Sequence, residues 1–176
     1  MKRSIEELLY NYPVIRYEFI GSEELTFTER VRTICRDECP RYVKSLSFPP
    51  ATGEVESCRK MCLSYPNVLL YTTQSEVEDA QIMEQALASR KYHEEITREI
   101  LAGIRQLGAD CFALSGDSCQ ICEHCAYPEP CRHPEQAIPC IESYGIVVPL
   151  IAEKYGIEFY TDLHTVTWFG MIFWRQ

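Results

Sequence analysis

The apolar positions of this chain switch between helical and strand-like spacing, so we expect helices and strands to follow one another along it. Helices are predicted from a capping box that begins at Ser4, across residues 28–36, and from about Glu54. Between them, residues 13–20 and 68–71 are typical of strands. The second of these is an unbroken apolar run, which indicates a strand buried on both faces.

A longer helical pattern follows. Ser75 and Glu78 form a second capping box, and apolar residues keep helical spacing from there to Gly108. The middle of this stretch, residues 89–95, is polar, so the helix is expected to kink there or to change its packing partner. Residues 109–114 then form a third apolar run, which predicts another buried strand.

The C-terminal part adds two predicted helices, over 134–144 and 147–155 and separated near Gly145, and a last strand over 165–174 that is apolar on both faces. Strands that alternate with helices indicate an α/β fold. We therefore predict one domain over residues 1–176, in which helices pack on a small mixed sheet and a cysteine-rich, ferredoxin-like metal-binding loop is inserted after the third strand.

Composition narrows the class of protein. With 176 residues, 46% of them hydrophobic, the chain is long enough for one sizeable core. Its net charge of −9 would repel a phosphate backbone, so nucleic-acid binding is not expected. The longest apolar run, over residues 165–174, is shorter than the roughly 20 residues of a spanning helix, so no membrane segment is expected. Residues 1–10 lack the apolar core of a signal peptide, which predicts a cytoplasmic protein.

Ten cysteines are unusual in such a chain. Cytosolic thiols stay reduced, so clustered cysteines there indicate metal binding or catalysis more than disulfides. The cysteines gather in two segments, over residues 35–62 and 119–140.

The most informative motif is a run of four cysteines spaced Cys-x2-Cys-x2-Cys-x5-Cys. A backbone that wraps around one centre lets such closely spaced thiols hold an iron–sulfur cluster. Zinc sites more often pair two Cys-x2-Cys knuckles roughly 12 to 20 residues apart, so the spacing favours a [4Fe–4S] cluster over zinc, with unligated thiols as the third alternative. His124 and His133 are either substitute ligands or exposed loop histidines. The four cysteines are Cys119, Cys122, Cys125 and Cys131.

A second group consists of two Cys-x3-Cys pairs, Cys35 with Cys39 and Cys58 with Cys62. Cysteines four residues apart on a helix share one face, so the two pairs are candidates for a second metal site. The alternative is that they are small buried hydrophobic residues.

Two cysteines remain outside these groups. Cys111 falls in a predicted buried strand and is expected to be core packing. Cys140 follows Pro139 near a predicted helix start, where it would be a spare ligand, a reactive thiol or an unreactive helix cysteine.

These residues resemble a family of predicted metal-binding proteins, domain of unknown function 2284. One segment resembles the family pattern Arg-x2-Cys-x3-Cys-x2-Tyr followed by Trp-x-Cys-Pro-Pro, and the other is the loop from Cys119 to Pro134 with residues 142–146 downstream. The first pattern is matched here at Arg32, Cys35, Cys39, Tyr42, Pro49 and Pro50, with Cys58 and Tyr65 following.

The resemblance implies metal binding and names no reaction. This chain departs from the family pattern at Leu46, where the family has tryptophan, and at Phe48, where it has cysteine. The first site would therefore lack one ligand unless Cys62 replaces it, or only the Cys119 to Cys131 loop binds metal.

Three functions fit the sequence, and they include both a carrier and an enzyme. The leading hypothesis is an electron-transfer protein with one [4Fe–4S] cluster on the Cys119 to Cys131 loop, a second cluster if the other group also closes, and a redox partner protein. The first alternative is an iron–sulfur enzyme with an open iron site. The second alternative is a zinc-binding structural or interaction module.

Overall fold

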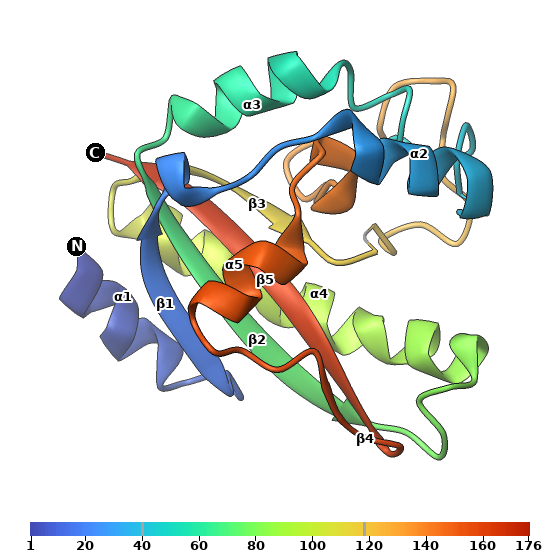
Figure 1. The fold of residues 1–176 in the computed structure, drawn as a ribbon. Helices are drawn as coiled ribbons and strands as arrows, with labels where there is room; N and C mark the ends of the chain where they lie inside the picture. Colours follow the sequence, from blue (N-terminus) through green and yellow to red (C-terminus); the bar gives the residue numbers. More distant parts are fainter. Residues whose placement is uncertain (40, 118) are drawn as a thin grey trace.

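A twisted, curling five-stranded sheet runs through the middle of the molecule in the computed structural model, which describes residues 1–39, 41–117 and 119–176 (Figure 1). Its strands are β1 (Arg16–Gly21), β2 (Asn67–Glu76), β3 (Asp110–Ser115), β4 (Tyr160–Asp162) and β5 (Thr165–Arg175). The order is β1-β2-β5-β3, and the short β4 also pairs with β5. The long β2 and β5 therefore form the centre of the sheet.

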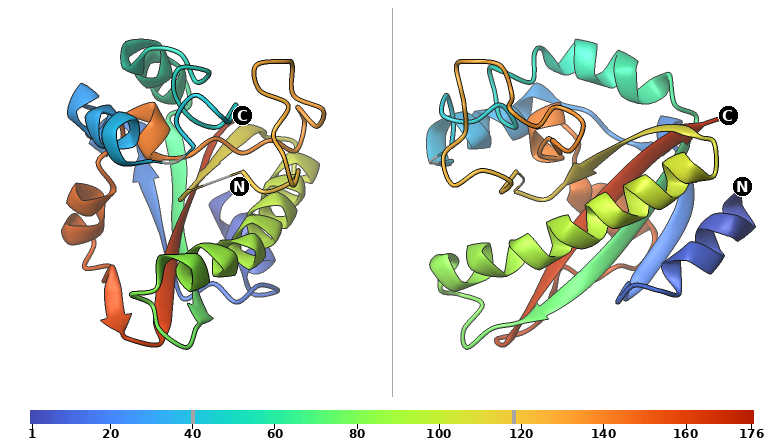
Figure 2. Two further views of the ribbon diagram at one scale, coloured as in Figure 1. Left: turned by 90° about the vertical axis from the view of Figure 1, so that its right-hand side faces the viewer. Right: turned by 180° about the vertical axis from the view of Figure 1, so that it is seen from behind.

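Helices cover both faces of this sheet (Figure 2). One face packs on α1 and α4, and the other on α3, α5 and a short 3-10 helix, η2. The helices are α1 (Lys2–Leu9), α2 (Glu29–Glu38), α3 (Val55–Leu63), α4 (Met83–Gln106) and α5 (Val148–Lys154), with the 3-10 helices η1 (Ser22–Glu24) and η2 (Glu142–Tyr144). Within the described residues, no helix is both long enough and apolar enough to span a bilayer.

The central strands are apolar on both faces because both faces are covered. On β2, Val68 and Leu70 belong to the core on the α5 side, whereas Leu69 and Tyr71 belong to the core on the α4 side. All four are fully buried. The strands predicted at 68–71 and 165–174 are thus confirmed, and the α/β class with an inserted cysteine-rich loop is confirmed with them.

A glycine on β5 makes room for a tyrosine that connects the sheet to α4. Gly170 pairs with Tyr71 across β2 and β5, and a Cβ at Gly170 would lie 2.4 Å from Cζ of the tyrosine ring. The Tyr71 hydroxyl instead reaches α4, where it donates to Thr97 Oγ1 at 2.6 Å. Gly170 therefore leaves room for the ring of a buried tyrosine that joins the two layers.

The strand pairs are all antiparallel, which corrects the prediction of a mixed sheet. The segment from β2 through α4 to β3 does have the form of a crossover between two strands that run in the same direction. Those strands are not neighbours, however, because β5 lies between them and pairs antiparallel with each. The alternation of strands and helices along the chain indicated the crossover. It did not indicate that β5, from the end of the chain, lies between β2 and β3.

Two predicted helix starts are wrong, and one predicted helix mostly does not form. The first helix begins at Lys2, before Ser4. The long helix begins at Met83 because Ser75 and Glu76 continue β2 and pair with β5, so Ser75 and Glu78 form no capping box. The helix predicted over 134–144 is reduced to η2.

The segment before η2 is irregular because its backbone pairs with other segments. The carbonyl of Pro139 accepts from Ser115 N at 3.1 Å, and Ile141 N donates to Ser115 O at 3.2 Å. These bonds tie the segment to the end of β3.

The helix predicted over 28–36 is confirmed as α2. Thr28 is its N-cap, and its side chain accepts from Arg30 N at 3.2 Å.

Candidate metal centre

The cysteine loop leaves the sheet at the end of β3 and is anchored there by buried charges. Asp117 forms an ion pair with Arg90 of α4, and its carbonyl accepts from Arg41 Nη1 at 2.8 Å. The Arg90 side chain is only 6% exposed. The first turn of the loop is therefore held by cations from two different segments.

A second ion pair on α4 continues this anchor. Glu94 is fully buried, and its Oε2 accepts from Arg98 Nη2 at 2.6 Å and from the backbone N–H of Gln120 at 2.9 Å. These residues explain the polar middle of the long helix, which runs through this stretch as one continuous element. Here α4 contacts the cysteine loop through Glu94 and Arg98, while His93 Nδ1 lies 2.8 Å from Thr73 Oγ1 of β2.

Four cysteines of the loop line one cavity of about 60 Å³, whose other wall includes Ser45, Leu46 and Pro139. Cys125 is exposed, and the other three are half-buried. Among the described residues, no three His, Cys, Asp or Glu side chains are gathered closely enough to hold a single metal ion. The thiols thus surround a cavity without meeting at one point. They are Cys119, Cys122, Cys125 and Cys131.

Three of these sulfurs accept hydrogen bonds from N–H groups. Such bonds are expected where sulfur is to carry negative charge as a metal ligand. Two of the donors are backbone amides, and the third is a guanidinium. The pairs are Leu46 N with Cys125 Sγ at 3.4 Å, His133 N with Cys131 Sγ at 3.4 Å, and Arg98 Nη2 with Cys119 Sγ at 3.5 Å.

The environment of Cys125 favours its thiolate. Partial burial acts to raise the pKa of the thiol, but hydrogen bonds from the backbone amides of Leu46, Tyr127 and Ala126 and from Ser45 outweigh burial, so the pKa of Cys125 lies below its ordinary value. A thiolate is the form that binds metal. Leu46 and Ser45 belong to a segment far from the loop in sequence, which spacing could not have related to it.

The two loop histidines lie at different places. His133 lines the same cavity as the four cysteines, while His124 lines a neighbouring groove. Both are exposed. The carbonyl of His124 accepts from Arg132 Nη2, so Arg132 braces the loop across its own turn.

The second predicted group is divided in the structure. Cys35 lies on the last turn of α2 and Cys39 follows as its C-cap, and both line a larger cavity of about 390 Å³ together with Cys140. Cys58 and Cys62 lie on α3 and belong to the core beside Tyr144; they are not among the residues that line this cavity.

Cys58 and Cys62 behave as core residues. Cys62 is fully buried, and burial raises the pKa of its thiol far above the ordinary range. The Cys58 thiol donates to Thr52 O at 3.2 Å and lies 3.6 Å from Arg32 Nη2. Cys111 is buried in β3, as expected.

Cys140 precedes only the three-residue 3-10 helix η2, in place of the longer helix predicted over 134–144. It is 2% exposed, and burial raises the pKa of its thiol well above the ordinary value. A helix-stabilised reactive thiolate at this position is therefore unsupported.

Arg32 joins the two segments that carry the family resemblance. Its Nη2 donates to Ser143 O at 2.5 Å, and its Nη1 donates to Gly53 O. Ser143 is fully buried. Two motifs that are remote in sequence are thus docked on one another through Arg32.

A comparison with protein families gives one match, the model described as "Predicted metal-binding protein (DUF2284)", over residues 18–174. The match covers most of the chain, including all ten cysteines. Neither the curated proteins nor the solved structures give a match.

Proposed function

The chain belongs to this family of predicted metal-binding proteins, and we propose that Cys119, Cys122, Cys125 and Cys131 bind one [4Fe–4S] cluster through which the protein transfers single electrons. The observation that carries the proposal is that four thiols line one cavity while N–H groups donate to three of their sulfurs. The four ligands, the kind of metal and the redox role are what we propose beyond family membership.

The shape of the site supports a cluster over zinc. A zinc ion needs four thiolates about 2.3 Å from a single point. The described side chains are not gathered in this way. In a [4Fe–4S] cluster each thiolate binds a different iron, so the thiols must surround a space larger than one ion. The cavity of about 60 Å³ exceeds the roughly 10 to 15 Å³ that one water requires.

Residues around the loop are suited to a centre that gains and loses negative charge. A groove of about 790 Å³ lies beside Cys119, Cys122 and Cys125, and four basic side chains line it against one acidic one, Glu123. Positive charge close to the sulfurs stabilises the more negative, reduced state. The basic residues are Arg41, Lys44, Arg90 and Lys91.

The groove also supports electron exchange with another protein. Its opening lies over three cysteines, one of them exposed, so a redox partner could bring its own centre close to the loop. The chain as a whole carries a net charge of −9, which makes this basic groove the place where an acidic partner would be attracted.

The test is a metal and sulfide analysis of protein purified without oxygen, with absorption spectra before and after dithionite. A [4Fe–4S] cluster on this loop predicts about 4 iron and 4 sulfide per cluster, a band that dithionite bleaches, and their loss in Cys125→Ala. Cys111→Ala, which removes a thiol from the core of β3, is the matched control and should keep them. Stoichiometric zinc without sulfide would refute the redox proposal and support a zinc-stabilised interaction module.

A further inference from the structure

Three cysteines from remote parts of the chain line one mostly apolar cavity. Cys35 and Cys39 reach it from the end of α2, and Cys140 reaches it from the segment that follows the cysteine loop. An isolated bridge between Ser115 and Cys140 holds this segment against the end of β3. The fold therefore places three thiols around one space of about 390 Å³.

The polar groups of this cavity are mostly acidic. Glu38, Asp117 and Glu142 line it together with the three thiols, against a single basic residue, Arg41. The Cys140 thiol, which is buried, donates to Oε2 of the half-buried Glu142 at 3.0 Å. Asp117 is paired with Arg90, so two of these carboxylates already have partners.

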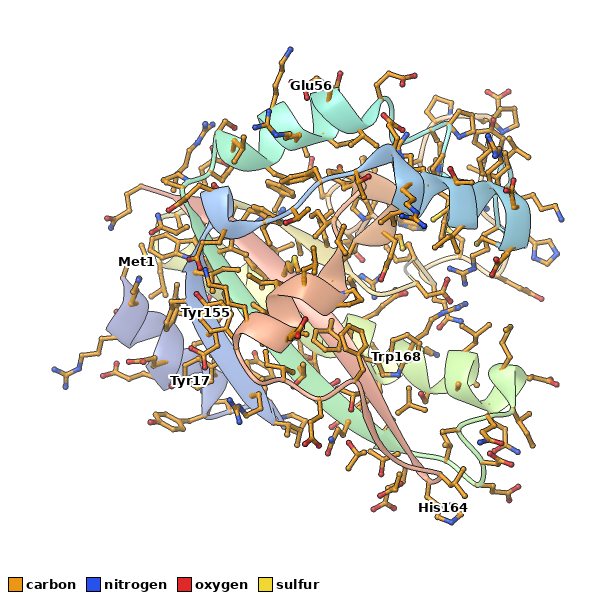
Figure 3. All side chains as sticks on the ribbon, viewed as in Figure 1. Met1, Tyr17, Glu56, Tyr155, His164 and Trp168 are labelled. Carbon is orange, nitrogen blue, oxygen red and sulfur yellow. The ribbon has the colours of Figure 1, made fainter. Side chains whose placement is uncertain are left out.

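The rest of the cavity is apolar and contains no fourth thiol among the described residues that line it. Phe48, Val148 and Phe169 contribute to the lining, and Trp168 of β5 closes the side toward α4, where its Nε1 donates to Ser89 Oγ at 2.9 Å (Figure 3).

We propose that Cys35, Cys39 and Cys140 are the three thiolate ligands of a second iron–sulfur cluster, whose fourth iron is open toward the apolar part of the cavity. Three thiols that surround a space suit a polynuclear cluster, because each thiolate binds a separate iron. An iron without a protein thiolate is a Lewis acid and accepts a soft external ligand such as a small thiol. This proposal stands independently of the Cys119 to Cys131 site.

The two cavities share a wall. Phe48 and Cys140 line the larger cavity, and their chain neighbours Ser47 and Pro139 line the smaller one. The two segments are joined by a hydrogen bond from Cys140 N to Ser47 O at 3.2 Å. With both sites filled, an electron received at the exposed loop would reach the buried site by crossing this wall, which oxidises the first centre and reduces the second.

The experiment is an iron and sulfide count on anaerobically purified variants. Wild-type protein should contain roughly 8 iron per chain, and Cys39→Ala and Cys140→Ala should each contain roughly 4. Cys39 is half-buried at a helix end, so its variant is expected to fold even if Cys140→Ala does not, and circular dichroism checks this. The matched control is Cys62→Ala, a fully buried cysteine outside the cavity, which should keep the wild-type content.

The open iron has its own readout. Adding 2-mercaptoethanol should change the electron paramagnetic resonance spectrum of the reduced wild type and of Cys125→Ala, and should leave that of Cys39→Ala unchanged. The added 2-mercaptoethanol binds the iron that has no protein ligand, so the spectral change should come from the second site alone. A folded Cys39→Ala with wild-type iron, or a loss of iron in Cys62→Ala that equals the loss in Cys140→Ala, overturns the ligand set.

The same counts separate this proposal from the preceding one. About 4 iron in the wild type, all lost in Cys125→Ala, would refute the second cluster and leave the first. About 4 iron that disappears only in Cys39→Ala and Cys140→Ala would support the second site and refute the first.

Discussion

The contact between Arg98 and Cys119 gives the most direct test of how this fold would set a redox potential. Replacing Arg98 with glutamine removes a positive charge whose Nη2 lies 3.5 Å from the Cys119 sulfur. It also leaves the buried carboxylate of Glu94 without its partner at 2.6 Å. Both changes make the surroundings of the proposed cluster more negative, so its reduced state should lose stability and its midpoint potential should fall.

The magnitude follows from the geometry. Two unit charges 4 Å apart interact by about 4 kcal/mol at an effective dielectric constant of about 20. Cluster charge is spread over several atoms, and the Arg98 side chain is 20% exposed, so we expect a quarter to a half of that value. A shift of about 1 to 2 kcal/mol corresponds to about 40 to 90 mV for a one-electron couple.

The assay is a dithionite titration of the iron-loaded protein followed by absorption. Two matched variants test whether charge causes the shift in potential. Arg98→Lys keeps the positive charge and should shift the potential by less than half as much as Arg98→Gln. Glu94→Gln removes a buried negative charge and should raise the potential. A potential for Arg98→Gln that stays within about 10 mV of wild type, at full iron content, would refute the reasoning.

Three further measurements check other parts of the structure. Burial lowers the pKa of His93 from 6.5 to about 4, so the unfolded chain takes up a proton first as the pH falls, and the free energy of unfolding should drop by about 2 kcal/mol between about pH 7.5 and about pH 5. Denaturant unfolding should show this component in wild type and not in His93→Gln, and identical pH profiles would contradict it. Gly170→Ala should destabilise the fold by about 1 to 3 kcal/mol because its Cβ meets the Tyr71 ring, whereas Gly116→Ala, with no neighbour closer than 3.5 Å, should melt near wild type; equal melting temperatures of the two would exclude the clash. Removing the metal should speed amide exchange in residues 119–134 while the amides of β2 and β5 stay protected, and uniform loss of protection across the sheet would show that the site stabilises the whole fold.

The central strands were predictable because burial on both faces leaves a local signature. Residues 68–71 and 165–174 are unbroken apolar runs, and the structure covers both of their faces. The start of α4 was not predictable in this way. Ser75 and Glu78 match the capping-box pattern, but Ser75 pairs with Val166 of β5, and that partner lies too far along the chain for a local motif to indicate it.

The two candidate sites differ in the same way, because local spacing indicated one of them and not the other. The spacing of Cys119, Cys122, Cys125 and Cys131 is local, so the sequence alone indicated that these four thiols lie together, and they do line one cavity. The association of Cys35 and Cys39 with Cys140 depends on how two remote segments dock, and helical spacing suggested Cys58 and Cys62 instead. Glu94 gave only a weak signal, as part of the polar stretch over residues 89–95, and Arg98 lies outside that stretch.

The position of β5 between β2 and β3 has a consequence for how the protein acquires its native state. Asn67 and Trp174, which pair at one end of the β2 and β5 ladder, are separated by 107 residues, and sheets built from such distant pairs fold slowly. Until that ladder closes, Cys58, Cys62 and Cys140 have no core to shield them, although each is buried once it does. Unshielded thiols are open to oxidation and to mispairing. The yield of refolded protein should therefore depend on reductant during the slow closure of the sheet, and oxygen admitted after closure should do far less harm to these buried cysteines.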